Sequence, residues 1–122
     1  MAINVSTTER TTPTFTTTLL DAASLPVPGT SLQSILLTLY DVASGSIINS
    51  RNLQSVLGGD VTVDALGLLI WVLKELDTVI VNDALAEEEH IALFEIRWLV
   101  AGSPRVMRED VSITVRNLAR VS

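Results

Sequence analysis

Two strand-length segments of this chain carry apolar side chains on both of their alternating faces, and this feature limits the possible folds most. The first is the run Leu68-Leu69-Ile70-Trp71-Val72-Leu73, which has no polar alternate, and the second covers residues 91–100. A chain of 122 residues suits one domain, whose two layers enclose a single interior. We therefore expect some apolar side chains to remain on outer faces, where contiguous apolar patches usually mark contacts with other proteins.

The periodicity of these segments favours strands but leaves helices open. In the second segment, every other residue belongs to one face, in strict alternation with its neighbours. That face consists of His90, Ala92, Phe94, Ile96, Trp98 and Val100. A helical pattern also fits the first segment, through Leu66, Leu69, Ile70, Leu73, Leu76 and Ile80. Part of the range 83–100 fits a helix as well, with Asn82 or Asp83 as its cap.

Turn residues between β-prone runs predict two hairpins. The first joins the runs 34–40 and 46–49 through a loop that ends at Gly45. The second joins 61–63 to 68–73 through Asp64-Ala65-Leu66-Gly67, which suits a type I turn, and we expect its return strand to be buried on both faces. After a turn at 101–104, alternation over 111–116 predicts a half-buried strand. Several short strands with such turns indicate an antiparallel sandwich.

The first 30 residues differ in composition from the rest of the chain. They are rich in Thr, which favours extended backbone, and they contain Pro13, Pro26 and Pro28. We expect an extended N-terminal arm over residues 1–30, with a possible strand from Thr14 to Leu20, and a sandwich domain over residues 31–122. The arm could be a frayed terminus, or it could lie on a neighbouring subunit, anchored by Phe15, Leu19 and Leu20.

Composition argues against several classes of function. The formal net charge of −6 opposes binding to nucleic acid and to anionic membranes, both of which attract cationic surfaces. The absence of Cys excludes disulfides and thiolate metal sites. No apolar run approaches the roughly 18 residues that a membrane span needs, and the N-terminus shows no signal-peptide pattern, so we expect synthesis in the cytoplasm.

A search for chemistry in the sequence finds no catalytic, cofactor-binding or metal-binding constellation. His90 is the one histidine, no G-x-S-x-G elbow occurs, and Gly58-Gly59-Asp60 matches no phosphate-binding loop. We expect His90 to be a structural hydrogen-bonding residue and the acidic cluster of Asp83, Glu87, Glu88 and Glu89 to be a solvated loop, with a calcium site as the alternative. The aromatic residues Trp71, Trp98 and Tyr40 are expected in the core, although they could instead stack on sugar rings. The interface residues that we predict are Phe15, Leu19, Leu20, Ile91, Leu93 and Leu99.

Four segments of the chain, taken in order, carry a resemblance. They are Leu37–Arg51, Val63–Trp71, Glu89–Trp98 and Asp110–Leu118. Together they resemble small immunoglobulin-like β-sandwich proteins of tailed bacteriophage virions, over roughly residues 31 to 118. The resemblance strengthens the case for strands at 68–73 and 89–100 and implies an all-β, immunoglobulin-like antiparallel β-sandwich.

The resemblance also implies a function without catalysis. It implies a virion structural protein, made in the cytoplasm of a bacterial host, that acts as a capsid cement or decoration protein. Its partners would be the major capsid protein or other virion proteins, with homo-oligomers expected and no cofactor. Two alternatives stay open: a tail, neck or baseplate component of the same fold, and a carbohydrate-binding module that uses Trp71 or Trp98.

Overall fold

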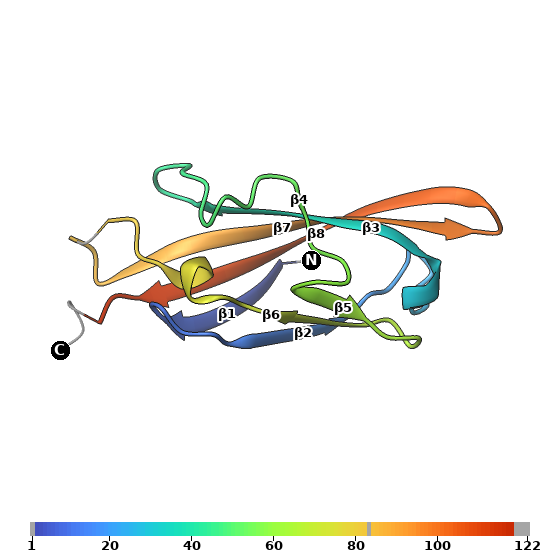
Figure 1. Ribbon diagram of the computed structural model, residues 1–122, viewed down its shortest axis with the longest axis horizontal. Helices are drawn as coiled ribbons and strands as arrows, with labels where there is room; N and C mark the ends of the chain where they lie inside the picture. The colour runs from blue at the N-terminus through green and yellow to red at the C-terminus, as the bar shows by residue number, and fades with distance from the viewer. Residues whose placement is uncertain (1, 83, 119–122) are drawn as a thin grey trace.

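The computed structural model describes residues 2–82 and 84–118, and it shows two β-sheets packed face to face (Figure 1). The larger sheet has the strand order β1-β8-β7-β3-β4 and consists of β1 (Ala2–Thr8), β8 (Ser103–Arg116), β7 (Glu87–Val100), β3 (Leu32–Asp41) and β4 (Gln54–Ser55). The smaller sheet has the order β2-β6-β5 and consists of β2 (Thr14–Thr18), β6 (Leu68–Val72) and β5 (Val61–Val63). The 3₁₀ turns are η1 (Gly29–Ser31) and η2 (Glu75–Thr78). The predicted all-β sandwich is confirmed, although the larger sheet is mixed, because β1 runs parallel to β8.

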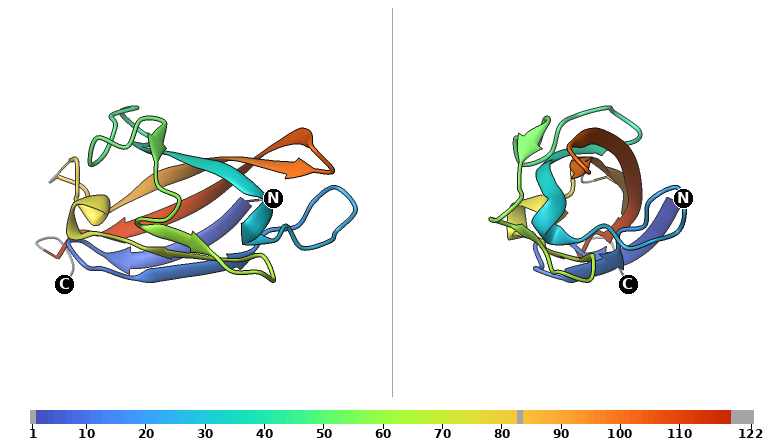
Figure 2. Two further views of the ribbon diagram at one scale, coloured as in Figure 1. Left: turned by 45° about the vertical axis from the view of Figure 1, so that its right-hand side comes forward. Right: turned by 90° about the vertical axis from the view of Figure 1, so that its right-hand side faces the viewer.

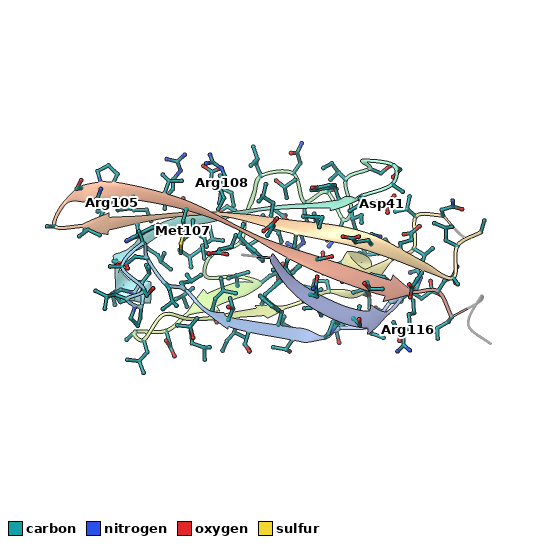
Figure 3. All side chains as sticks on the ribbon, turned by 180° about the vertical axis from the view of Figure 1, so that it is seen from behind. Asp41, Arg105, Met107, Arg108 and Arg116 are labelled. Atoms are coloured by element: carbon teal, nitrogen blue, oxygen red, sulfur yellow. The ribbon has the colours of Figure 1, made fainter. Side chains whose placement is uncertain are left out.

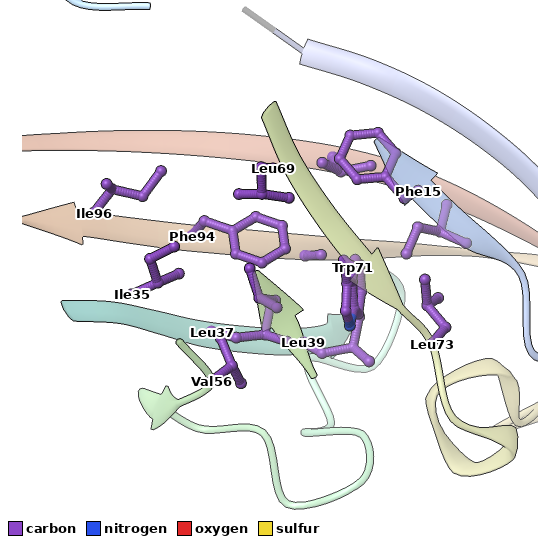
Figure 4. Close-up of a cluster of buried hydrophobic side chains, with 14 of the residues drawn as sticks. Phe15, Ile35, Leu37, Leu39, Val56, Leu69, Trp71, Leu73, Phe94 and Ile96 are labelled. Carbon is purple, nitrogen blue, oxygen red and sulfur yellow. The ribbon is translucent and has the colours of Figure 1, made fainter. Parts of the chain in front are cut away.

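Side chains from both sheets fill one interior, and the end-on view shows the strands wrapped around it (Figure 2). Alternate residues of β7 point inward, including Ala92, Phe94 and Ile96, and they meet Leu69 and Trp71 from the smaller sheet. The rings of Trp71 and Phe94 pack edge to face, with their centroids 5.3 Å apart (Figure 4). The sequence left two segments open between strand and helix, and both are strands in the structure, namely β6 and β7.

The hairpin from β5 to β6 forms as predicted. The backbone nitrogen of Gly67 donates to the oxygen of Asp64, as a type I turn requires, and Val63 pairs with Leu69. The return strand, however, is buried on one face and not on both. Leu69 and Trp71 point into the core, whereas Val72 is 48% exposed on the other side of the sheet. The sheet is a surface layer, so its outer face remains open to solvent.

The first predicted hairpin forms only in part. After β3 the chain turns at Gly45, where φ is +74°, and Ile47 makes an isolated bridge to Tyr40. The return segment is irregular because Asn49, Ser50 and Leu53 adopt left-handed backbone conformations, with φ between 51° and 56°. In this return segment, regular pairing with β3 occurs only at β4.

The predicted separation of residues 1–30 from the sandwich is wrong. β1 extends the larger sheet along β8, and β2 pairs with β6 in the smaller sheet. Phe15 and Leu19, which we expected to anchor an arm on a neighbour, are 7% and 2% exposed in the core of their own chain. The Thr-rich stretch is extended because it forms two edge strands. Among the described residues, no helix has the length and apolar character needed to cross a membrane.

Candidate docking groove at the hairpin end

β7 and β8 form a long hairpin whose tip extends past the strands beside it (Figure 1). Val100 pairs with Ser103, so Ala101 and Gly102 make a two-residue turn. Both have positive φ, 49° and 80°, as the hairpin turn of type I′ requires. β3 reaches β7 no further than Trp98, and β1 reaches β8 no further than Asp110. Within the described chain, the hairpin tip therefore has no strand on either side.

A groove of about 580 Å³ lies between this hairpin and the loop that follows β2. We call it the hairpin groove. Figure 2 shows the hairpin tip and that loop at the same end of the molecule. Residues 20–23 form one wall, the opposite wall carries Val100, Val106 and Met107, and Trp98 contributes to the lining while only 6% exposed. The polar side chains at the groove are Asp21, Arg105 and Glu109.

The groove is apolar in a way that is unusual for an exposed surface. Leu20, Val100 and Val106 are each between 43% and 45% exposed, and Leu99 beside them is 38% exposed. Apolar side chains gathered in one concave surface can be buried together by a single partner, which scattered side chains cannot. The hairpin groove is therefore a candidate site for binding another apolar surface.

The structure divides the six predicted interface residues into three groups. Phe15 and Leu19 are core residues. Leu20 and Leu99 lie at the hairpin end, where Leu20 lines the groove and Leu99 lines a smaller depression next to it. Ile91 and Leu93 are half-buried on the outer face of the larger sheet, opposite Tyr40 and Thr38 of β3.

Sequence reasoning missed the contribution of Val100, Val106 and Met107 to the groove. The turn at 101–104 was recognised, but nothing in the sequence showed how far the flanking strands extend past their neighbours. Residues that are compatible with strands extend for similar lengths before and after Ala101-Gly102, and this symmetry could have indicated a long hairpin.

A second group of polar residues is buried at the other end of β7. His90 Nε2 lies 2.9 Å from Glu88 Oε1 and 3.7 Å from Asp41 Oδ1, and all three side chains are buried. Glu88 also accepts hydrogen bonds from the backbone nitrogens of Val81 and Asn82. The group therefore attaches the loop before β7 to the sheet.

This arrangement bears on two sequence predictions. As predicted, His90 is a hydrogen-bonding residue near the start of a strand, and it is buried. The prediction of a loop is wrong for Glu87, Glu88 and Glu89, which begin strand β7. Glu88 is also not solvated, being 4% exposed, whereas Glu87 and Glu89 are exposed as predicted and Asp83 lies outside the described residues.

The same three residues form the one group in the described chain that could hold a metal ion, since their ligand atoms lie within 4.8 Å of one another. The geometry argues for a different role. Both carboxylates are already bound by protein donors, because Asp41 accepts from the backbone nitrogen and the hydroxyl of Ser44. His90 Nδ1 is buried and has no hydrogen-bond partner among the described residues, whereas a histidine that binds a metal normally donates its second nitrogen to a fixed acceptor.

A buried ion-pair network holds the irregular segment after β3. Arg51 Nε donates to Asp77 Oδ1 at 2.6 Å and Nη2 donates to Asp77 Oδ2 at 2.9 Å, while Nη2 also donates to Asp60 at 2.8 Å. Burial alone lowers the pKa of the Arg51 guanidinium, but its hydrogen bonds and charge interactions with both carboxylates outweigh burial and raise that pKa. The hydrogen bond from Arg51 lowers the pKa of Asp60, and Lys74 adds to this effect. The network joins η2, the residue before β5 and the segment after β3, which is a structural role.

The aromatic side chains offer little of a sugar-binding platform. Trp71 is fully buried and Trp98 is 6% exposed, so the prediction that both belong to the core is confirmed. The same prediction is wrong for Tyr40, which is half-buried on the outer face of the larger sheet. No known family model matches the chain, and no curated protein matches it at a significant level. The case for a function therefore depends on the sequence and the geometry alone.

Proposed function

We propose that this protein is a non-enzymatic assembly protein that binds another polypeptide through the hairpin groove. The observation that carries the proposal is the groove itself, with Leu20, Val100 and Val106 exposed around it. Burying a fully exposed Leu or Val contributes about 1.5–3 kcal/mol, so each of these half-exposed side chains could contribute about 1 kcal/mol. The unpaired edges of the hairpin would add backbone hydrogen bonds to a partner strand.

The resemblance to tailed-phage virion proteins suggests the setting. In that setting the protein would act as a capsid cement or decoration protein, bridging the major capsid protein or other virion proteins. Each single contact could be weak, because repetition over the shell adds avidity. A tail, neck or baseplate component of the same fold is the second candidate, favoured by the same groove.

The test uses particles purified from cells that express the protein together with the phage that encodes it. The variant Val100→Asp/Val106→Asp places charge in the groove, and we expect particles to lose most of the bound protein. The matched control is Val42→Asp/Val72→Asp, which adds the same two charges at valines that are both 48% exposed away from the groove. The protein bound per particle is measured by quantitative mass spectrometry.

The outcomes separate the candidates. Hundreds of copies per particle would support the cement role, and a few to tens would support a neck or tail position. If neither wild type nor control is found on particles, the virion role fails. If the groove variant binds as well as the control, the groove is not the docking site.

A further inference from the structure

We propose that the hairpin groove binds an extended segment of another polypeptide, which adds a strand to β8 in line with β1 and inserts an aliphatic side chain between the two sheets. This inference rests on the proposed function, because it names the kind of partner that the groove takes. It is carried by an unpaired stretch of backbone on β8 and by a cavity that opens into the groove.

The backbone groups of β8 point alternately toward β7 and toward the outer edge of the sheet, and two hydrogen bonds show which residues point which way. The backbone nitrogen of Asn117 donates to the oxygen of Ala86, just before β7, whereas the oxygen of Arg116 accepts from the backbone nitrogen of Glu9, just after β1. The register between β7 and β8 is continuous from Glu87 to Val100. The even-numbered residues of β8 therefore direct their N–H and C=O groups away from β7 along the whole strand.

β1 occupies only part of this outer edge. It pairs with β8 from Asp110 to Arg116, and no described residue pairs with the edge before Asp110. The backbone N–H and C=O groups of Val106 and Arg108 therefore point outward unpaired, and Pro104 presents a C=O group alone. Figure 3 shows Arg105, Met107 and Arg108 on the part of β8 that β1 does not reach. A strand placed here would continue the line of β1 along the same edge.

The hairpin groove runs along this unpaired edge, since Val106, Met107 and Glu109 line one of its walls. The loop on the other wall bonds its own backbone groups. Asp21 Oδ1 accepts hydrogen bonds from the backbone nitrogens of Ala23 and Leu25, and the backbone nitrogen of Asp21 donates to the oxygen of Leu25. An extended segment lying between the walls would therefore find its hydrogen-bond partners on β8 and not on the loop.

A smaller cavity of about 70 Å³ adjoins the groove, and we call it the interlayer cavity. Its lining includes Phe15, Thr17 and Leu69 from the smaller sheet and Phe94, Ile96 and Val111 from the larger sheet. Leu20 and Glu109 line both the groove and the interlayer cavity, so the two spaces meet there. An apolar cavity of roughly 150 Å³ holds a benzene molecule, so a cavity about half as large suits the end of one aliphatic side chain.

The chemistry of the groove favours an extended polypeptide over other apolar occupants. An α-helix bonds its own backbone groups, so it would leave those of Val106 and Arg108 unpaired. A lipid chain offers no hydrogen bond, and it would cover the half-buried carboxylate of Glu109, which has no hydrogen bond or ion pair with a described residue. A strand supplies backbone groups to β8, and its alternate side chains supply apolar contacts to the groove and the interlayer cavity.

The probe is a library of short random peptides, displayed on beads and selected for binding to the full chain. The selected peptides are then synthesised, and isothermal titration calorimetry measures their Kd values. We expect aliphatic residues at alternate positions of the selected peptides, because one face of an added strand meets the groove. Selected peptides whose apolar residues recur every three or four positions would indicate a helical partner and would overturn the inference.

Two variants of Arg108 isolate the backbone contact. Arg108→Pro and Arg108→Ala remove the same side chain, but only proline removes the outward N–H group. An edge strand tolerates proline at such a position, because no hydrogen bond to β7 is lost. We expect Arg108→Pro to bind the selected peptides about tenfold more weakly than Arg108→Ala, whose Kd should resemble that of wild type. Thermal melts show whether each variant is folded.

Hydrogen exchange of the wild-type chain tests the same contact without any substitution. The bound peptide should slow exchange at the amides of Val106 and Arg108 by about tenfold or more, and it should affect the amide of Met107 less, because that amide already faces β7.

A variant of Thr17 tests the interlayer cavity. Thr17→Leu fills this cavity from within the chain, so it should raise the melting temperature and weaken peptide binding several-fold. A raised melting temperature with unchanged peptide binding would show that no side chain of the partner enters the cavity.

The outcomes separate this inference from the proposed function. The inference fails if the library yields no binding peptide, if Arg108→Pro binds like Arg108→Ala, or if exchange at Val106 and Arg108 does not change. The proposed function would survive each of these results if Val100→Asp/Val106→Asp still lost its place on particles, because the groove would then bind a partner in another conformation. If that variant keeps its place on particles while the peptide results hold, the groove binds strands but is not the docking site on the particle.

Discussion

Arg51→Ala should destabilise this protein more than any substitution of an exposed charge. Arg51 is 2% exposed and Asp77 is fully buried, and two hydrogen bonds of 2.6 and 2.9 Å join them. Removing the guanidinium leaves the Asp77 carboxylate in the interior with only the Asn49 side chain and the Lys74 backbone nitrogen as donors. Removing one partner of a buried pair costs about 3–5 kcal/mol, because the remaining charge is desolvated without compensation.

That cost is a large part of the total stability, which is about 5–15 kcal/mol for a domain of this kind. For a chain of this length, 1 kcal/mol shifts the melting temperature by about 3–5 °C, so we expect a shift of about 10–20 °C. Urea unfolding at pH 7, followed by circular dichroism, measures the change in free energy. Arg10→Ala is the control, and we expect its effect to stay within about 0.5 kcal/mol.

A double-mutant cycle tests the reason for the cost. When both charges are removed in Arg51→Ala/Asp77→Ala, no uncompensated carboxylate remains from the pair, so the double variant should lose much less stability than the sum of the single variants. If Arg51→Ala alone cost under about 1 kcal/mol, the pair would behave like a surface ion pair. Strict additivity in the cycle would equally refute the argument.

Three further predictions concern pH, core packing and backbone space. The folded state lowers the pKa of Asp60, so the contribution of this carboxylate to stability is present above its unfolded pKa of about 3.9 and is lost as pH falls through the folded pKa. Asp60→Asn should therefore reduce the loss of stability that urea melts measure between pH 5 and pH 2. Phe94→Ala should cost about 3–5 kcal/mol, whereas Leu93→Ala on the outer face should cost clearly less, as chemical unfolding would show. Gly29→Ala should lower the melting temperature more than Gly45→Ala. An added Cβ at Gly29 would lie 2.1 Å from a backbone oxygen of β5, whereas one at Gly45 would meet nothing within 4 Å. Equal shifts in melting temperature would contradict this argument.

The strands could be predicted where turn chemistry and alternation agreed. The β5–β6 hairpin followed from Asp64 and Gly67, and the inward face of β8 followed from Val111, Ile113 and Val115. These signals are local, so the sequence contains them in full. The choice between strand and helix at β6 and β7 was not local, because it depends on which segments pair across the sheet.

The first 30 residues show why the rest could not be predicted. A Thr-rich, Pro-interrupted segment is extended whether it lies free or at the edge of a sheet, and composition cannot separate these states. Phe15 and Leu19 were predicted to contact a neighbouring subunit, and that prediction is wrong because their own chain covers them. The parallel pairing of β1 with β8 joins residues more than 100 positions apart, and no short-range pattern specifies it.

The apolar residues therefore lie in two kinds of place in the structure. Some of them close the sandwich, since the first strands supply core side chains that we had assigned to a neighbour. Others gather at the ends of the molecule, where Val100 and Val106 at the hairpin and Leu76 and Val81 near η2 remain exposed. A two-layer sandwich has no third layer that covers the ends of its strands. Apolar residues at those ends therefore contribute little to the fold of an isolated chain. Their most direct physical role is contact with another polypeptide.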